Sequence, residues 1–196
     1  MMTNNKNAPL VAGLDIGTSK ISILIARVQN KTLEVIGVSS VPCNGVKKGA
    51  VVNIDAKKGA VVNIDATTEA IKKARIEAEL MSGIKISNVW AGVSASHVSS
   101  FNSTGMVAIK DKEVKQDDVE RVIEAAQAVA IKDDRELLHI LPQTFIVDSQ
   151  AGIRDPLGMS GVRLEVGAHL VAANSMTLVN LRKCAYKAEL QINGFI

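Results

Sequence analysis

A short acidic turn between two apolar runs constrains this chain more than any other stretch. Residues Val11–Lys20 read VAGLDIGTSK, and a second apolar run, Ile21–Val28, follows directly. A buried strand that ends in Asp15 and turns through Gly17 offers a carboxylate for a metal ion and backbone N–H groups for phosphate oxygens. An ordinary β-hairpin with a polar turn has the same pattern, so the decapeptide alone leaves both interpretations open. A Walker A loop is excluded because it requires GxxxxGK[ST] leading into a helix.

The composition favours a globular chain and argues against several functions. The sequence has 196 residues, of which 47% are hydrophobic and 3% aromatic, and its formal net charge is +3. Interspersed charges and few aromatic rings disfavour a nucleic-acid surface. Cys43 and Cys184 lie far apart, without a CxxC partner or a nearby histidine, so we expect neither a disulfide framework nor a zinc site. A reduced, cytoplasmic setting fits this cysteine usage.

The N-terminal segment has none of the features of a targeting signal. Met1–Pro9 is polar and rich in asparagine, without the apolar centre of a signal peptide, and we expect it to be disordered. No later apolar run reaches the length needed to cross a bilayer. Any membrane contact would therefore need a segment outside this sequence.

Hydrophobic periodicity and turn signals predict two clusters of strands and helices. A meander of three strands opens the chain, followed by a helix with Asp65 or Thr67 as its cap and Gly83 just past its end. The second cluster is expected to run strand, helix, strand, strand, with a turn at Asn102–Gly105. The expected strands are 10–16, 21–29, 33–41, 88–99, 106–109, 136–148, 161–173 and 191–196, and the expected helices are 67–82, 116–131 and 175–187.

A repeated decapeptide interrupts this order. KKGAVVNIDA occupies Lys47–Ala56 and again Lys57–Ala66 without a single difference, which chance does not produce. A stacked repeat fold would need more copies, so this is a local duplication. We expect the second copy to lead directly into the following helix and the first to bulge. A surface connection tolerates this because doubling a loop costs roughly 0.6 kcal/mol of closure entropy.

The remaining candidate residues are assigned structural or surface roles. We expect Trp90 and Phe101 in a core, and Arg154 exposed in a Gly/Pro-rich loop where it suits an interaction better than catalysis. The histidines occur without an HExxH or Ser/His/Asp arrangement, so hydrogen-bonded structural roles are expected rather than metal ligation. They are His97, His139 and His169.

Several longer motifs follow the acidic turn in a fixed order. They are GLDIGTSKI at 13–21, VKKGAVVNID at 46–55, GVSASHVSSFNSTGMVAI at 92–109, and LHILPQTFIVD with GIRDPLGMSGVRLEVGAHLV between Leu137 and Val171. In this order they resemble the FtsA family of bacterial cell-division proteins, within the superfamily of actin, hexokinase and heat-shock chaperones. The resemblance covers the chain from Leu10 onward and about the first half of the family's usual length.

This resemblance implies an actin-like, ribonuclease H-like α/β fold in truncated form. Residues 10–84 and 173–196 would form subdomain 1A, and residues 85–172 the inserted strand-helix-strand-strand subdomain 1C. The chain departs from the family at two helix ends. Lys115 stands where many relatives have a capping threonine, which would weaken that helix start by about 1 kcal/mol. Glu189 replaces a frequent helix-ending glycine, so the last helix is expected to be poorly terminated.

The loop from Asp15 to Lys20 resembles the family's first phosphate loop. In that loop the acid acts on the magnesium ion of ATP through water, and the turn meets the β- and γ-phosphates. Because the second phosphate loop and the adenosine pocket belong to the missing half, we expect this chain to bind nucleotide weakly or not at all. No catalytic residue is expected. The implied cofactor-binding residues are Asp15, Gly17, Thr18, Ser19 and Lys20, with Asp15 also on the magnesium side.

The resemblance implies a scaffold in septum formation rather than an enzyme. FtsA-like proteins bind ATP, polymerise, bind FtsZ through another subdomain and attach it to the cytoplasmic face of the inner membrane by a C-terminal amphipathic helix. Subdomain 1C is similar to the part that contacts other FtsA subunits and late division proteins. One alternative is an ATP-dependent small-molecule kinase of the same superfamily, although we find no candidate base. Another is a stand-alone interaction module formed by Lys85–Ala172.

Overall fold

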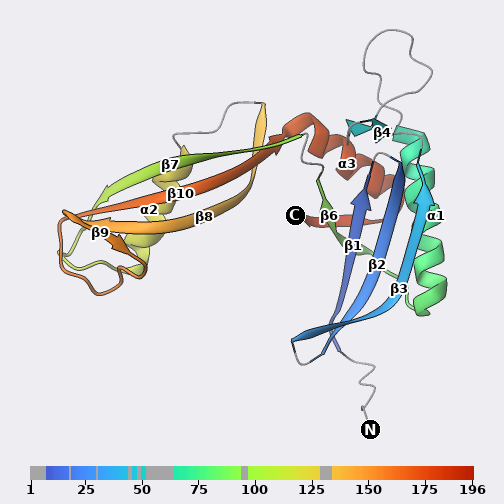
Figure 1. Cartoon of the computed structure of the whole chain (residues 1–196), viewed down its shortest axis with the longest axis horizontal. Helices are drawn as coiled ribbons and strands as arrows, with labels where there is room; N and C mark the ends of the chain where they lie inside the picture. Colours follow the sequence, from blue (N-terminus) through green and yellow to red (C-terminus); the bar gives the residue numbers. More distant parts are fainter. Residues whose placement is uncertain are drawn as a thin grey trace. The chain divides into compact units, whose positions relative to one another are not determined.

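The protein folds as two compact units (Figure 1). The computed structural model describes residues 8–17, 19–29, 31–43, 46–47, 50–51, 64–93, 97–128 and 134–196. The first unit comprises Met1–His97 and Met176–Ile196, and the second comprises Val98–Ser175.

The first unit is built on a five-stranded sheet in the order β11-β6-β1-β2-β3. β1 (Leu10–Ile16), β2 (Lys20–Gln29) and β3 (Thr32–Pro42) form the predicted antiparallel meander. β6 (Asn88–Gly92) pairs parallel with β1, and β11 (Gln191–Phe195) pairs parallel with β6. The carboxyl ends of these three parallel strands therefore meet at one edge of the sheet.

The start of β1 is tied to the sheet before the strand formally begins. The backbone N–H of Val28 donates to the carbonyl oxygen of Pro9 over 2.9 Å. The disorder predicted for residues 1–9 is therefore wrong at Pro9, because β2 extends far enough to hold it. Residues 1–7 lie outside the described part of the chain.

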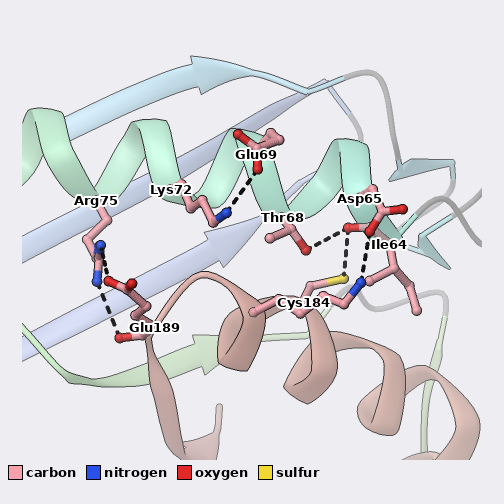
Figure 2. Close-up of polar contacts among 9 residues, drawn as sticks. Ile64, Asp65, Thr68, Glu69, Lys72, Arg75, Cys184 and Glu189 are labelled. Carbon is pink, nitrogen blue, oxygen red and sulfur yellow. Dashed lines mark hydrogen bonds and ion pairs between the residues drawn. The ribbon is translucent and has the colours of Figure 1, made fainter.

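Two helices cover one face of this sheet. α1 (Ile64–Ser82) lies along β2 and β3, and α3 (Ser175–Lys187) lies beside α1, as Figure 2 shows. Gly37 of β3 permits the approach, because a Cβ there would lie 2.6 Å from the carbonyl oxygen of Ala78. The buried side chains of this core include Leu14, Ile21, Ile23, Ile25, Ile71, Val89, Leu178 and Leu181.

Helix α1 starts earlier than predicted, at Ile64 rather than Thr67. Asp65 and Thr67 therefore lie in the first turns and do not cap the helix. The Thr68 hydroxyl donates to the carbonyl oxygen of Ile64 over 2.7 Å, and an acid in the first turn suits the helix dipole. At the other end Gly83 has a φ of 70°, which confirms its predicted left-handed role.

The helix start also shows how the decapeptide repeat is used. Ile64–Ala66 ends the second copy and opens α1, so the prediction that this copy leads directly into the helix is confirmed. Lys47 of the first copy belongs to β4 (Val46–Lys47), which pairs antiparallel with β5 (Ala50–Val51). Ala50–Val51 also belong to the first copy, and its remaining residues, where a bulge is predicted, lie outside the described residues.

Helix α3 is well terminated, contrary to the prediction. Glu189 adopts the left-handed conformation, with a φ of 59°. The N–H of Leu190 donates to the carbonyl oxygen of Ala185, and the N–H of Glu189 donates to that of Tyr186, each over 2.9 Å. These are the two hydrogen bonds of a Schellman motif, formed here around a glutamate instead of a glycine.

The second unit packs one helix on a four-stranded sheet of order β7-β10-β8-β9. Its elements are β7 (Val98–Ala108), α2 (Gln116–Ala128), β8 (Arg135–Val147), β9 (Gln150–Ile153) and β10 (Arg163–Asn174). The predicted order strand, helix, strand, strand is present, and β9 adds a short strand inside the predicted loop. The core contains Val122, Ala126, Phe145, Leu164, Val166, Ala168 and Leu170.

A side chain from within α2 replaces the missing cap at its start. The backbone N–H of Lys115 donates to the Asp118 carboxylate over 3.0 Å, which is one half of a capping box. This hydrogen bond lowers the pKa of Asp118, and the Arg121 guanidinium pairs with the same carboxylate. The N-terminal turn of α2 is therefore held in place although Lys115 has no capping hydroxyl.

The strand predicted at 88–99 is wrong. Its first part is β6 in the first sheet, and its last residues open β7 in the second sheet. Because β6 pairs with β1, the structure assigns residues between Lys85 and His97 to the first unit, whereas the sequence-based boundary lies at Lys85.

The turn predicted at Asn102–Gly105 is also wrong, because β7 runs straight through it in register with β10. The Ser103 hydroxyl donates to the carbonyl oxygen of Ala126 over 2.7 Å. A Cβ on Gly105 would lie 2.1 Å from the carbonyl oxygen of Val122. Small and polar residues therefore serve close packing of α2 on the strand and not a reversal of the chain.

Candidate functional site

The predicted phosphate loop joins β1 to β2 at the carboxyl edge of the parallel strands. Asp15 is exposed, and its register neighbours are Ser22 in β2 and Gly92 in β6. Ser22 in turn donates to the hydroxyl of Ser40 over 3.2 Å. A polar row thus crosses the sheet next to the edge where ligands bind in open α/β sheets.

The C-terminal end of the described chain reaches the same edge. The N–H of Ile196 donates to the carbonyl oxygen of Ala91 over 2.9 Å, and the carbonyl oxygen of Ile196 accepts from the N–H of Val93 over 3.1 Å. The carboxyl ends of β1, β6 and β11 are therefore held together beside Asp15.

Part of the turn's hydrogen-bonding capacity is already used inside the fold. The N–H of Gly17 donates to the carbonyl oxygen of Lys20 over 3.0 Å, and the carbonyl oxygen of Ser19 accepts from Cys43 over 2.9 Å. The predicted residue Thr18 lies outside the described residues. Ser19 and Lys20 are exposed, so the turn that follows Asp15 presents a hydroxyl and an ammonium to solvent.

The residues present fit the magnesium side of a nucleotide. Carboxylate oxygens are the ligands that Mg²⁺ prefers, directly or through water. Glycines keep the surroundings of the Asp15 carboxylate open. A Cβ on Gly92 would lie 3.5 Å from Oδ1 of Asp15, and one on Gly17 would lie 3.9 Å from Oδ2. The described loop supplies one acid, one hydroxyl and one cation, and these can contact one side of a phosphate chain.

Two of the three histidines lie on neighbouring strands of the second unit. His139 lies in β8, and His169 in β10 has its Nδ1 2.7 Å from Oδ1 of Asn102. This contact agrees with the predicted hydrogen-bonded role of His169. No group of three or more His, Cys, Asp or Glu side chains suited to a metal ion occurs among the described residues.

Of the predictions for the remaining candidate residues, two are confirmed and one is wrong. Phe101 packs against the core of the second unit, as predicted, and Arg154 is exposed, as predicted. The prediction that Trp90 lies in a core is wrong, because 42% of its surface is exposed. A Cβ on Gly194 would lie 2.5 Å from the Trp90 ring, so the indole lies over the neighbouring strand β11.

A polar junction between α1 and α3 was not predicted from the sequence (Figure 2). The Lys187 ammonium lies 2.9 Å from Oδ1 of Asp65, which lowers the pKa of Asp65 and raises that of Lys187. The Arg75 guanidinium lies 2.7 Å from the carboxylate of Glu189 and lowers its pKa. Burial raises the pKa of the Cys184 thiol to about 11, so it stays protonated and is no nucleophile. This junction has the character of a structural contact.

Comparison with known proteins explains this combination of a loop and an inserted unit. A profile described as the SHS2 domain inserted in FtsA matches residues 95–172. Cell division protein FtsA of Pseudomonas aeruginosa is 41% identical over 196 residues, which is 100% of this chain and 45% of that protein. The chain belongs to the FtsA family. FtsA of Escherichia coli K12 is 35% identical over 188 residues, covering 95% of this chain and 42% of that protein.

The chain thus spans less than half the length of these FtsA relatives. Among solved structures, the PilM-PilN type IV pilus biogenesis complex contains a chain that matches with a TM-score of 0.60. That match covers 94% of this chain and 46% of the other at 14% identity, so it supports the fold alone. The predicted actin-like α/β fold class is confirmed. Of the helices that the structure describes, none has the length and apolar character needed to span a membrane.

Proposed function

We propose that this chain forms the part of an FtsA-type cell-division protein that carries the first phosphate loop and the inserted interaction subdomain. The supporting observation is the match of residues 95–172 to the SHS2 domain of FtsA, which falls mainly on the second unit. The first unit then corresponds to subdomain 1A and the second unit to subdomain 1C. In the full-length protein these parts serve a scaffold that binds ATP, polymerises and links FtsZ to the inner membrane during septum formation.

The nucleotide role assigned to this chain is limited to one side of magnesium ATP. Asp15 would hold the magnesium ion through water, and Thr18, Ser19 and Lys20 would contact phosphate oxygens, with Gly17 leaving room for their approach. When bound, the ion would supply positive charge that offsets the charge of the phosphates. An open loop with few donors holds a phosphate weakly because water competes for each contact. The chain alone is therefore expected to bind ATP weakly and to catalyse no reaction.

Partner binding is divided between this chain and the rest of the protein. The second unit is proposed to contact other FtsA subunits and late division proteins. FtsZ and the membrane are reached through parts of the full-length protein beyond the matched region. The full-length protein is accordingly proposed to act at the cytoplasmic face of the inner membrane.

A chimera tests this assignment. The matching segment of Pseudomonas aeruginosa FtsA is replaced by this chain, and the chimera is expressed in cells depleted of their own FtsA. Restored septation is expected. The Asp15→Asn chimera is expected to lose nucleotide binding and septation. Glu77→Gln is the matched control, since Glu77 is an exposed acid of α1 in the same unit as Asp15.

Two results would overturn the proposal. One is a chimera that folds and accumulates normally while its cells stay filamentous. The other is ATP turnover by the chain that depends on an added small-molecule acceptor, which would favour the kinase. Calorimetry with magnesium ATP checks the separate statement that the loop is incomplete, and saturable micromolar binding to the chain alone would contradict it.

A further inference from the structure

Two histidines lie together on the face of the second unit's sheet opposite α2. β8 and β10 pair antiparallel (Figure 1), and His139 of β8 lies opposite Val171 of β10, two residues along from His169. The register between these residues is uninterrupted, so both imidazoles lie on the same face of the sheet, opposite to the buried side chain of Leu170. Such diagonal neighbours have their Cα atoms roughly 7–8 Å apart, and their side chains can reach one another.

Asn102 holds one of these rings in a defined orientation. Its Oδ1, on the neighbouring strand β7, lies 2.7 Å from Nδ1 of His169. An amide oxygen only accepts hydrogen bonds, so Nδ1 of His169 carries the proton and donates the hydrogen bond, and Nε2 keeps its lone pair. Because Nδ1 faces β7, Nε2 lies on the opposite side of the ring, toward β8 and His139. Metal-binding histidines are commonly oriented in this way, by a hydrogen bond from the other ring nitrogen.

We propose that His139 and His169 bind one zinc ion between β8 and β10. Neutral imidazole is a preferred zinc ligand, with Zn–N distances of about 2.0–2.1 Å, and two rings at diagonal strand positions can converge on one ion. Asn102 is then a positioning residue that keeps Nε2 of His169 available for the ion. All three residues lie within 95–172, the segment that matches the SHS2 profile, so the site is formed inside that inserted domain.

Water completes the coordination of the ion at this site. No third His, Cys, Asp or Glu side chain joins the pair among the residues that the structure describes. Glu165, on the same strand, is paired with Arg163 over 3.0 Å, and both cysteines are buried in the first unit. With two of the four ligands of a structural zinc site, the pair is expected to bind zinc with a Kd on the order of 10 µM. Magnesium prefers oxygen ligands, so the proposal is independent of the phosphate loop.

Calorimetric titration of the untagged full chain with zinc chloride tests the proposal. We expect one ion per chain. His139→Gln and His169→Gln are each expected to raise the Kd at least about tenfold, because each removes one of the two protein ligands. His97→Gln is the matched control, since it removes the remaining histidine of the chain, which lies in the first unit, and is expected to change the Kd less than about twofold. Far-UV circular dichroism confirms that each variant is folded.

The contact with Asn102 provides a second test. Asn102→Leu removes the acceptor and should raise the Kd about tenfold, whereas Asn102→Asp keeps an acceptor and should not. In proton–nitrogen correlation spectra of the imidazoles, zinc is expected to shift the Nε2 signal of His169 and to leave Nδ1 protonated. Zinc binding that survives both histidine substitutions, an equal loss in His97→Gln, or no saturation below about 1 mM zinc overturns the proposal. A Kd that Asn102→Leu leaves unchanged overturns the positioning role of Asn102.

Discussion

The Nζ of Lys187 lies 2.9 Å from Oδ1 of Asp65, and this contact joins the last turn of α3 to the first turn of α1. Each charge also suits the dipole of its own helix, with the acid at an N-terminus and the cation at a C-terminus. Asp65 belongs to the second copy of the repeated decapeptide. The ion pair therefore shows that the second copy forms the start of α1 and contacts α3.

Replacing Asp65 by asparagine is expected to cause a small fall in Tm near neutral pH. Lys187 lowers the pKa of Asp65 in the folded state, so the pair stabilises the fold above the unfolded pKa of about 4. That stabilisation is lost as the pH falls through the folded pKa, and the Tm difference between Asp65→Asn and wild type should vanish at about pH 2. Both side chains are largely exposed, so added salt should also reduce the difference. Calorimetry at two pH values measures it.

The duplication provides a matched control for this substitution. Asp55 occupies the equivalent position of the first copy, with the same decapeptide around it. Asp55→Asn is expected to leave Tm unchanged at both pH values. An equal loss of Tm in the two variants would show that the copies exchange places at the start of α1.

Deleting one copy of the decapeptide is expected to preserve the fold. Removal of Lys47–Ala56 or of Lys57–Ala66 yields the same sequence, and the remaining copy still supplies an Ile-Asp-Ala start for α1. The shorter connection should stabilise the chain by roughly 0.6 kcal/mol through its lower closure entropy. Urea unfolding measures the gain, and loss of helical circular dichroism on deletion would contradict this account.

The sequence predicts the elements whose pattern is local. The opening meander and α3 follow from apolar runs, helical spacing and flanking turn residues, and the structure has them within a residue of the expected bounds. The turn predicted at Asn102–Gly105 is wrong because the residues that suggested it, Ser103 and Gly105, make tertiary contacts with α2. Nothing in the local pattern separates a glycine that turns the chain from one that admits a helix.

In the candidate site, too, the sequence predicts the local features and the fold supplies the rest. The exposure of Asp15 at the carboxyl end of β1 follows from the apolar run that precedes it. The parallel strands that converge beside it come from Asn88–Gly92 and Gln191–Phe195, and only the fold brings them to the same edge. The internal hydrogen bond of the Gly17 amide depends on the exact conformation of the turn, which composition does not encode.

Replacing Gly105 by alanine is expected to destabilise the second unit by about 1–3 kcal/mol, the usual cost of overpacking. The new methyl group would lie 2.1 Å from the carbonyl oxygen of Val122 and must push α2 away from β7. Gly167→Ala, in the adjacent strand, is the control, because its nearest neighbour lies at 3.9 Å. Urea unfolding of the two variants measures the difference. Equal stabilities would contradict the close approach of α2.

Glu189 is expected to affect the thermal stability of the protein in two opposing ways, which a change in salt concentration can separate. Its left-handed backbone favours glycine, whereas its carboxylate pairs with Arg75 over 2.7 Å. Salt screens the exposed ion pair but leaves the backbone preference unchanged. The Tm of Glu189→Gly should therefore rise relative to wild type as the salt concentration increases. Glu189→Gln removes the charge and keeps the strained backbone, so its deficit at low salt should disappear at high salt. Thermal unfolding of the three proteins across a salt series measures both trends, and a Tm difference for Glu189→Gly that is independent of salt would show that the Arg75 pair contributes nothing to the end of α3.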